Sequence, residues 1–536
     1  MNLSSKMKNQ QDFKKTKSST FLLMLIGLAS TAWFLIRVIP KPSRATYPCI
    51  RTAAPFMSAF IIFLFSMGTT ILSLKKSRQN FAKAKYLSGS VFLLAAILSF
   101  SFYLFQDGKK SIARSIIKLD GTFPVLSNEP VGKAIGLFPG RVVWIYDEDA
   151  TNENYDPASA GKDWWYSHNN VDQEVVDKML STAILQYAGN NDISEAWEAI
   201  FKSYNSSHGR GKSGYSAGEK IVIKINLTNQ NGVSSERMDA TPQLLNALLH
   251  ELTANAGVLE SDITLGDPYR DFRAEYVDMV RSEFPGVQYV EGKGRNGVIQ
   301  TIPSEKELLV FSDKKIKSTL PQYYLDATYL INIPCLKTHG GGGLTLIAKN
   351  HLGSFLEKGS DPASQSASAV HYSLPSSTPG QQKYRNLVDF MGHEETGGKG
   401  LLYIIDGIWG GEDWKGWIKK FKSSPFDNDY PNSLLIGQDP VALESVCFDI
   451  LFEECLTDKS KETYPITLKN EIADYLLQCA SAEYWPDSIK YDPEADGSVL
   501  ESLGVFEHWN NASDKEYSRN LGSGDGIELI YADLAE

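Results

Sequence analysis

The sequence is poor in cysteine and lacks the cysteine spacings that metal and redox sites use. Only 5 cysteines occur among 536 residues, and none of them forms a Cys-x-x-Cys pair. This excludes a disulfide-stabilised scaffold, a zinc ribbon and a self-contained iron–sulfur module. The signatures of P-loop NTPases, dinucleotide-binding domains, serine hydrolases and zinc peptidases are also missing. The sequence therefore leaves any cofactor unknown.

Basic residues are scarce outside the N-terminal part of the chain. Residues 1–118 contain 18 Lys and Arg against 2 Asp. Residues 119–536 contain 35 basic and 62 acidic residues, a net charge of −27. An acidic body of this kind repels phosphate backbones, which argues against nucleic acid as a partner.

Three long apolar stretches predict transmembrane helices at residues 21–39, 54–74 and 86–105. Each has about 20 residues, enough to cross roughly 30 Å of hydrocarbon as a helix, and none carries a central charge. A cleaved signal peptide is the weaker interpretation, because the first stretch is too long and more spans follow it. We therefore expect a multi-pass integral membrane protein whose first partner is the lipid bilayer.

The predicted domain organisation follows from these spans. Residues 1–106 form a membrane anchor, residues 107–131 a linker, and residues 132–536 a soluble domain. An N-terminus inside the cell places about ten basic residues in the cytoplasm and about eight outside, which favours an extracytoplasmic soluble domain by a narrow margin.

The sequence predicts that the soluble domain has an α/β fold with a largely parallel sheet and flanking helices. Short β-branched runs alternate with amphipathic stretches, the pattern of parallel βαβ units. Helices are expected to open at Thr241-Pro242 and at Asp439-Pro440, where a capping residue precedes a proline. The expected strands are Arg141–Tyr146, Ile221–Asn226, Ile263–Gly266, Val287–Val290, Tyr329–Ile333, Leu401–Ile405 and Leu434–Gly437.

Polar residues follow several of these strands and predict a site at one edge of the sheet. In open parallel sheets, ligands bind beyond the carboxyl ends of the strands. Gly, Asp and Pro at such positions also serve as turn and cap residues, but turn chemistry does not require Lys337 or His339. The residues of this group are Lys224, Asn226, Asp267, Lys337, Thr338, His339, Asp406 and Asp439.

The segment with the highest density of candidate functional residues runs from Ile331 to Gly353, and it predicts an anion-binding site. Four successive glycines, Gly340, Gly341, Gly342 and Gly343, can turn their backbone N–H groups inward as an anion-binding nest. Lys337 and Lys349 supply positive charge, and His339 can gain a proton near neutral pH. Asn350 follows Lys349 directly in the sequence. A phosphate, a carboxylate or a cofactor bearing either is the expected ligand, and a flexible glycine loop with solvated lysines is the alternative.

Catalytic and metal roles follow from the same residues. His339 is the candidate general acid or base, and Lys337 and Lys349 hold the anion beside it. Either Asp406 or Asp267 orients the imidazole or binds a metal. Asp267 and Asp439 could bind a divalent cation such as Mg²⁺, although both also suit turn and cap positions. Cys335 follows a strand next to Lys337, where either a reactive thiol or a buried structural cysteine fits.

Several of these segments resemble the bacterial and archaeal family known as domain of unknown function 362. The resemblance covers roughly residues 132–535, and its most specific part is the pair Lys337-Thr338-His339 and Lys349-Asn350-His351-Leu352-Gly353. The other matching segments are Lys224-Ile225-Asn226-Leu227, Ala240-Thr241-Pro242, Gly266-Asp267, Ile405-Asp406-Gly407 and Asp439-Pro440-Val441-Ala442.

The resemblance implies no specific activity, because the family has no general assigned function. Many of its members look exported, and with the three predicted spans in place of a single export signal we expect this protein in the bacterial plasma membrane. Some members carry four-iron clusters, but the cysteines here lack cluster spacing, so iron–sulfur binding does not carry over. Glu444 stands where the family pattern leads us to expect Asp.

Two functional hypotheses remain open from the sequence. In the first, the protein is a membrane-anchored enzyme that binds an anionic small molecule or cofactor and acts on it by acid–base or metal-assisted chemistry. In the second, the same site holds a ligand without turnover, and the three helices dock a membrane protein partner.

Overall fold

The computed structural model describes most of the chain beyond residue 126. The described residues are 127–158, 163–229, 235–268, 270–364, 367–458 and 473–535, with isolated positions between 72 and 94.

The chain divides into two compact units, Met1–Lys118 and Leu119–Glu536. Apart from isolated positions, the expected spans at 21–39, 54–74 and 86–105 lie outside the described residues. Within the part of the chain that is described, no helix combines the length and apolar character needed to cross a bilayer. The three spans therefore stay a prediction.

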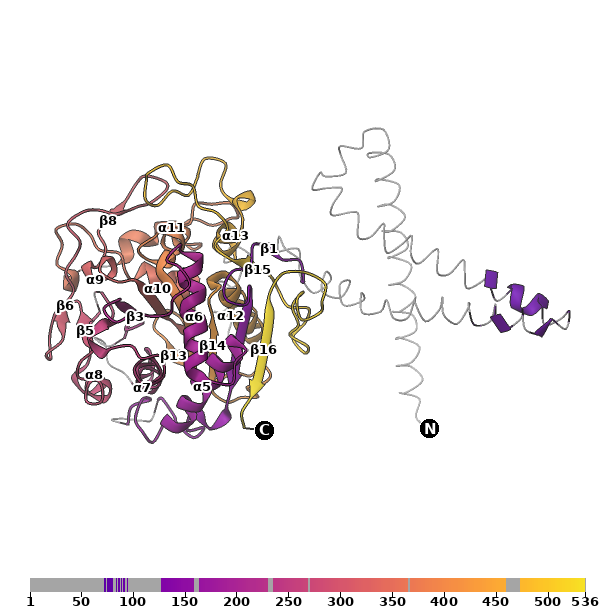
Figure 1. Cartoon of the computed structure of the whole chain (residues 1–536), viewed down its shortest axis with the longest axis horizontal. Coiled ribbons are helices and arrows are strands. Elements are labelled where there is room, and N and C mark those ends of the chain that lie inside the picture. Colours follow the sequence, from indigo (N-terminus) through magenta and orange to yellow (C-terminus); the bar gives the residue numbers. More distant parts are fainter. Residues whose placement is uncertain are drawn as a thin grey trace. The chain divides into compact units, whose positions relative to one another are not determined.

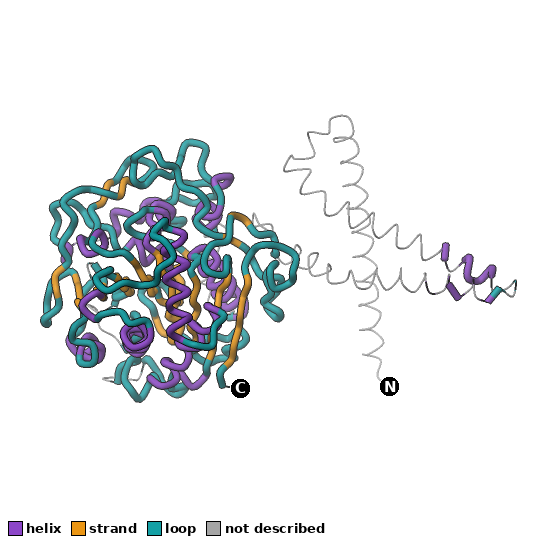
Figure 2. Tube along the Cα trace, in the orientation of Figure 1, coloured by secondary structure: helices purple, strands orange, loops and turns teal. Residues whose placement is uncertain are grey.

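A central β-sheet with helices on both faces forms the second unit (Figure 1). Figure 2 shows the strands gathered in the middle, with helices and loops around them. Along the sheet the strands are β16 (Glu528–Asp533), β2 (Arg141–Tyr146), β14 (Ser433–Gly437), β12 (Gly400–Glu412), β9 (Tyr329–Ile333), β3 (Ile221–Ile225), β4 (Ile263–Gly266), β5 (Gln288–Glu291) and β6 (Ile299–Gln300).

The sheet is mixed, so the expectation of a largely parallel sheet is wrong at that level of detail. Strand β14 runs antiparallel to both of its neighbours, β12 and β2. The chain from β12 to β14 contains only β13 (Trp417–Ile418) and loops, and an antiparallel connection needs no crossover helix. The strands β12, β9, β3, β4 and β5 are parallel, as predicted, and β6, which the sequence did not predict, pairs in parallel with β5.

Alternate residues along β2 enter two separate hydrophobic cores, while Val222 of β3 and Leu330 of β9 belong to a third, smaller one. Val143 and Ile145 of β2 belong to one core, whereas Val142 and Trp144 belong to the other. The first core is completed by α5 (Gln173–Ala188), α6 (Ile193–Ser207), α7 (Pro242–His250) and α8 (Ala274–Arg281). The second is completed by α10 (Ile347–Leu352), α11 (Asn386–Gly392), α12 (Pro440–Thr457) and α13 (Asp474–Ala480). The unit is therefore a three-layer α/β/α structure.

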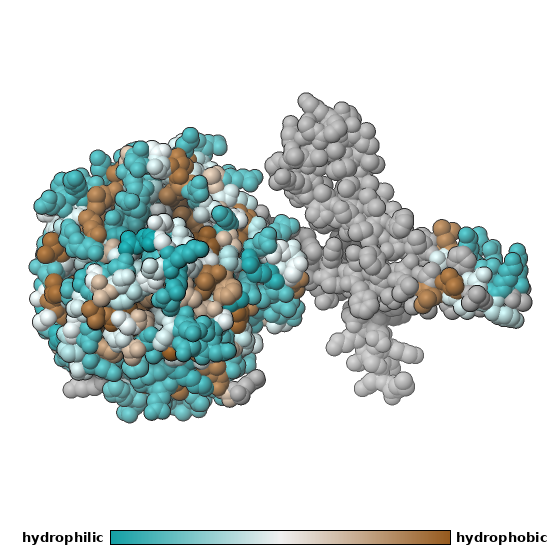
Figure 3. All heavy atoms as spheres, in the orientation of Figure 1, coloured by the Kyte–Doolittle hydropathy of each residue, from teal (hydrophilic) through white to brown (hydrophobic). Residues whose placement is uncertain are grey.

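Shorter elements complete the unit. Strand β10 (Cys335–His339) continues the path of β9 beyond Pro334, pairs in parallel with the far end of β12, and forms a hairpin with β11 (Gly343–Leu344). Two small antiparallel strand pairs lie outside the main sheet: β1 (Val131–Gly132) with β15 (Val505–Phe506), and β7 (Leu309–Val310) with β8 (Lys317–Ser318). The short helix α9 (Gln322–Leu325) completes the elements. The face drawn in Figure 3 is mostly hydrophilic, with scattered hydrophobic residues.

The predicted helix starts at Pro242 and Pro440 are confirmed. Asp439 caps α12 through its side chain, which accepts from the N–H groups of Val441 and Ala442. Thr241 precedes α7 and makes no side-chain cap; its hydroxyl donates to Asp406. The strands expected at β2, β4 and β9 have the predicted bounds.

Candidate functional site

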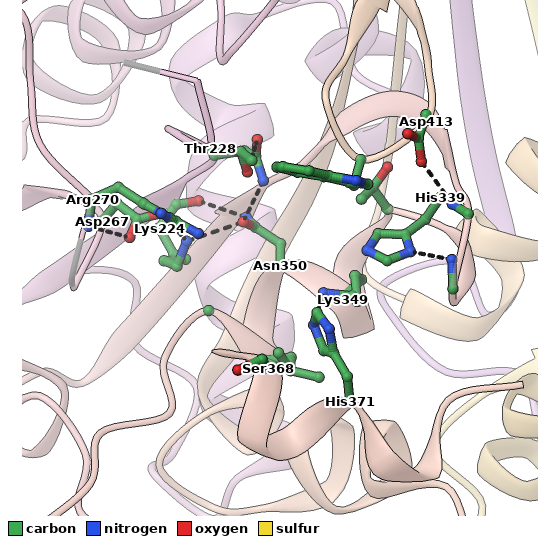
Figure 4. Close-up of a pocket in the computed structure, with 17 residues that line it drawn as sticks. Lys224, Thr228, Asp267, Arg270, His339, Lys349, Asn350, Ser368, His371 and Asp413 are labelled. Carbon is green, nitrogen blue, oxygen red and sulfur yellow. Dashed lines mark hydrogen bonds and ion pairs between the residues drawn. The ribbon is translucent and has the colours of Figure 1, made fainter. Parts of the chain in front are cut away.

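A cavity of about 600 Å³ opens at the carboxyl ends of β3, β4, β10 and β12. In Figure 4, Lys224, Asp267 and Arg270 lie together on one side of Asn350, and His339 lies on the other. The lining residues are Lys224, Asn226, Thr228, Asp267, Arg270, His339, Gly340, Gly341, Thr345, Lys349, Asn350, Leu352, Gly353, Ser368, His371, Asp413 and Trp414. Basic side chains thus converge on one cavity of an otherwise acidic unit.

Lys224 is held at the end of β3 by a complete set of acceptors. Its Nζ lies 3.0 Å from Asp267 Oδ2 and 3.0 Å from Asn350 Oδ1, and it also donates to the carbonyl of Ile225. Burial lowers the pKa of this lysine, and the neighbouring Asp267 carboxylate opposes that shift. The ion pair with Asp267 fixes one wall of the cavity.

Lys337 lies directly behind this wall and does not line the cavity itself. The side chain is fully buried, and its Nζ donates to Asn226 Oδ1 at 3.2 Å and to the Trp414 carbonyl at 3.5 Å. Both partners line the cavity. Lys337 therefore acts on the site through Asn226 and Trp414, which its amine holds. It does not line the cavity where a ligand would bind, contrary to the prediction from the sequence.

The glycine loop fixes the protonation state of His339 and does not form the expected anion nest. The N–H groups of Gly341 and Gly342 both donate to His339 Nδ1 at 2.9 Å, and that of Gly340 donates to Asp413 Oδ1 at 2.9 Å. A nitrogen that accepts two hydrogen bonds carries no proton, so the neutral ring has its proton on Nε2. Burial and the nearby Lys349 hold the pKa of His339 well below its usual value.

His339 therefore presents a neutral N–H donor to the cavity. Its Nε2 has no hydrogen-bond partner among the described residues, although the side chain is 6% exposed. Gly343 is outside the cavity lining and adopts a φ of 85°, a left-handed conformation that favours glycine at the turn into β11.

Lys349 and His371 form a contact between two bases. Lys349 Nζ lies 3.2 Å from His371 Nε2, and the ring of His371 lies 5.8 Å from that of His339. Burial and the positive charges of Lys337, Arg270 and Lys224 lower the pKa of Lys349 to about 7. Burial and Lys349 lower the pKa of His371 to about 4. The pair can thus gain or lose a proton near neutral pH.

The two aspartates Asp406 and Asp439 lie outside the cavity lining. Asp406 accepts from the N–H and hydroxyl of Thr241 at 2.6 and 3.1 Å, which ties β12 to the start of α7. Asp439 accepts from four backbone N–H groups at Ile135, Val441, Ala442 and Val505. Both carboxylates are fully occupied in holding backbone, so the structure does not bring Asp406 to His339 or Asp439 to Asp267.

Metal ligands do not gather in the described part of the unit. No group of three or more His, Cys, Asp or Glu side chains that could hold a metal ion occurs among the described residues. Asp267 lines the cavity, but it is paired with Lys224. Cys335 is fully buried, and burial raises the pKa of its thiol well above its usual value, which makes it a structural cysteine.

Several lining residues carried no recognisable signal in the sequence. Arg270 follows Asp267 by three positions at the end of β4, and its N–H donates to Asp267 Oδ1 at 3.1 Å. His371 and Ser368 come from a serine-rich stretch with no motif. Trp414 and Asp413 follow the long strand β12, where Thr338 Oγ1 accepts the N–H of Asp413 at 2.9 Å. Trp414 is 44% exposed and adds an apolar surface at the cavity.

A pair of substitutions at His339 tests the acceptor role of Nδ1. His339→Asn keeps an acceptor near the Nδ1 position, so we expect the free energy of unfolding to stay within about 0.5 kcal/mol of the parent. His339→Leu removes the acceptor of Gly341 and Gly342 and should lower that free energy by about 1–2 kcal/mol. Urea denaturation of both variants measures the difference, and equal losses would contradict this role.

The segment that forms the cavity is similar to a known protein family. No curated protein matches the chain. Residues 221–449 match the model of a family described as domain of unknown function (DUF362). Every residue that lines the cavity lies within these bounds. From β3 into α12, the chain is therefore similar to the DUF362 family.

Proposed function

We propose that the α/β unit binds a small anionic molecule in this cavity and acts on it by acid–base chemistry. The observation that carries the proposal is the convergence of Lys224, Arg270, Lys349 and the Nε2–H of His339 on one cavity. The acidic residues among those that line the cavity are Asp267 and Asp413, and each accepts a hydrogen bond from a neighbouring group. A phosphate or carboxylate would relieve the mutual repulsion of these cations.

Different parts of the cavity have different tasks in this proposal. Arg270 and Lys349 bind the anionic group, since a guanidinium and an ammonium are the strongest donors available for it. His339 donates from Nε2 to an oxygen of the ligand, and its neutral ring is held for that task by the glycine loop. Lys349 and His371 exchange a proton with the ligand.

The proposal also includes attachment to a membrane. The apolar stretches at 21–39, 54–74 and 86–105 support it by their length and lack of central charge. The basic residues that flank them favour an extracytoplasmic position for the α/β unit, so the ligand would come from outside the cytoplasm or from the lipid surface.

Sulfate binding to the full chain in detergent tests the anion site. We expect Arg270→Gln to weaken sulfate binding roughly tenfold or more, because a charged hydrogen bond is worth about 1.5–3 kcal/mol. The matched control is Arg281→Gln on α8, whose guanidinium pairs with Asp278 outside the cavity lining. Titration calorimetry gives both affinities, and equal affinities in the two variants would refute the site.

A further inference from the structure

Lys349 differs from the two other lysines of the site in what its amine contacts. Lys224 Nζ has three oxygen acceptors, and Lys337 Nζ has two. Lys349 Nζ has a single partner among the described residues, the ring nitrogen His371 Nε2 at 3.2 Å. No carboxylate of the described residues forms an ion pair with it. The first two lysines are held as structural cations, whereas Lys349 is not.

The surroundings of Lys349 make its free amine accessible near neutral pH, beside the ammonium form. The positive charges of Lys337, Arg270 and Lys224 lie near Lys349, and partial burial reduces the water that would stabilise a further charge. The contact with His371, at 3.2 Å, is compatible with the free amine, because a neutral imidazole nitrogen can accept one of its N–H groups. A neutral lysine amine in a cavity is a nucleophile.

We propose that Lys349 forms an imine with the carbonyl carbon of a small oxo acid whose acidic group is bound by Arg270. This inference rests on the proposed anion site and names its substrate class. A carbonyl compound is the class that a lysine amine attacks, and the acid group matches the cations that surround it. The aromatic face of Trp414 borders the same cavity and suits the carbon part of such a ligand.

The bond changes balance with the residues present. The lone pair of Lys349 Nζ attacks the carbonyl carbon, a C–N bond forms, and the carbonyl electron pair moves to oxygen. His371 carries one proton from the nitrogen to the new alkoxide, which gives a neutral carbinolamine, while the Nε2–H of His339 donates a hydrogen bond to that oxygen. His371 then takes the second proton from the nitrogen and passes it to the hydroxyl, which leaves as water as the nitrogen lone pair forms the C=N bond. Hydrolysis reverses each step.

Reductive trapping with glyoxylate tests the imine on the full chain. Glyoxylate is an aldehyde acid, and sodium cyanoborohydride reduces its imine to a stable carboxymethyl amine. We expect carboxymethylation of Lys349 at least tenfold faster than that of Lys202, an exposed lysine on α6, when peptides are followed by mass spectrometry. Excess sulfate should slow labelling of Lys349 and leave Lys202 unchanged. Lys349→Arg should remove the fast-labelled site.

The outcomes separate this inference from the anion site beneath it. Sulfate binding that Arg270→Gln weakens, without preferential labelling of Lys349, would overturn the imine and leave the anion site in place. Absence of both sulfate binding and labelling would overturn both. Fast labelling that sulfate does not slow would also contradict the inference, since amine and anion site would then not share a cavity. The competition by sulfate is measured on the parent chain, so its result does not depend on whether a variant folds.

Discussion

Lys349→Met is expected to weaken sulfate binding by about 2 kcal/mol at pH 6, roughly thirtyfold, and to abolish the pH dependence of binding. In the parent chain the pKa of Lys349 is lowered to about 7, because burial and the charges of Lys337, Arg270 and Lys224 disfavour its ammonium form. A bound anion favours that form, so binding above pH 7 must take up a proton. Calorimetric titration between about pH 6 and 9 measures the effect.

The sign of this dependence is fixed by the direction of the pKa shift. The ammonium is present below about pH 7, so affinity is highest there and falls by up to about tenfold per pH unit above it. His371, with a pKa of about 4, is neutral throughout this range. Asp389, Asp439 and Glu444 also have pKa values raised to about 7 by burial, but none of them lines the cavity.

Lys349→Arg is the matched control for this prediction. Arginine stays charged throughout the range, so the variant should bind sulfate at pH 9 more tightly than the parent and with little dependence on pH. A pH dependence that persists in both Lys349 variants would assign the proton to another group and contradict the account.

Arg385→Met is expected to lower the free energy of unfolding by about 3–5 kcal/mol. Arg385 is fully buried at the start of α11, and its Nε lies 2.8 Å from Asp474 Oδ2 on α13. Its other nitrogens donate to the carbonyls of Ser373, Thr378 and Gly380. The substitution leaves a buried carboxylate without its cation and three carbonyls without a donor. Urea denaturation measures the loss.

Two further variants show whether burial of the charge is responsible. Arg281→Met breaks a solvated pair with Asp278 and should cost less than about 1 kcal/mol. In the double variant Arg385→Met/Asp474→Leu no unpaired charge remains, so part of the lost stability should return. A loss from Arg385→Met no greater than that from Arg281→Met would refute this assignment.

The sequence predicted much of the site because parallel strands end at the same edge of a sheet. Lys224, Asp267 and His339 were placed together by that rule, and the structure brings them to one cavity. The direction of β14 was missed, since a strand buried on both faces has the same apolar pattern in either direction. The lack of a helix between β12 and β14 was the available signal.

The remaining residues of the site depend on contacts between distant parts of the chain. The segment that carries His371 is held by Arg385, whose partner Asp474 lies 89 residues further along the sequence. Residue spacing within a short stretch of sequence does not predict a contact between residues so far apart. The glycine run predicted N–H groups that bind an anion, but those of Gly341 and Gly342 donate to the imidazole of His339, and that of Gly340 donates to Asp413. Side-chain acceptors of this kind cannot be read from spacing.

The central claim is that an anion occupies the cavity between Arg270 and Lys349. Crystals of the full chain soaked in selenate, a sulfate analogue with an anomalous signal at the selenium edge, test it most directly. The account predicts an anomalous peak within hydrogen-bond distance of both side chains, and its loss in crystals of Arg270→Gln. Peaks confined to the molecular surface, with the cavity empty of selenate, would contradict it.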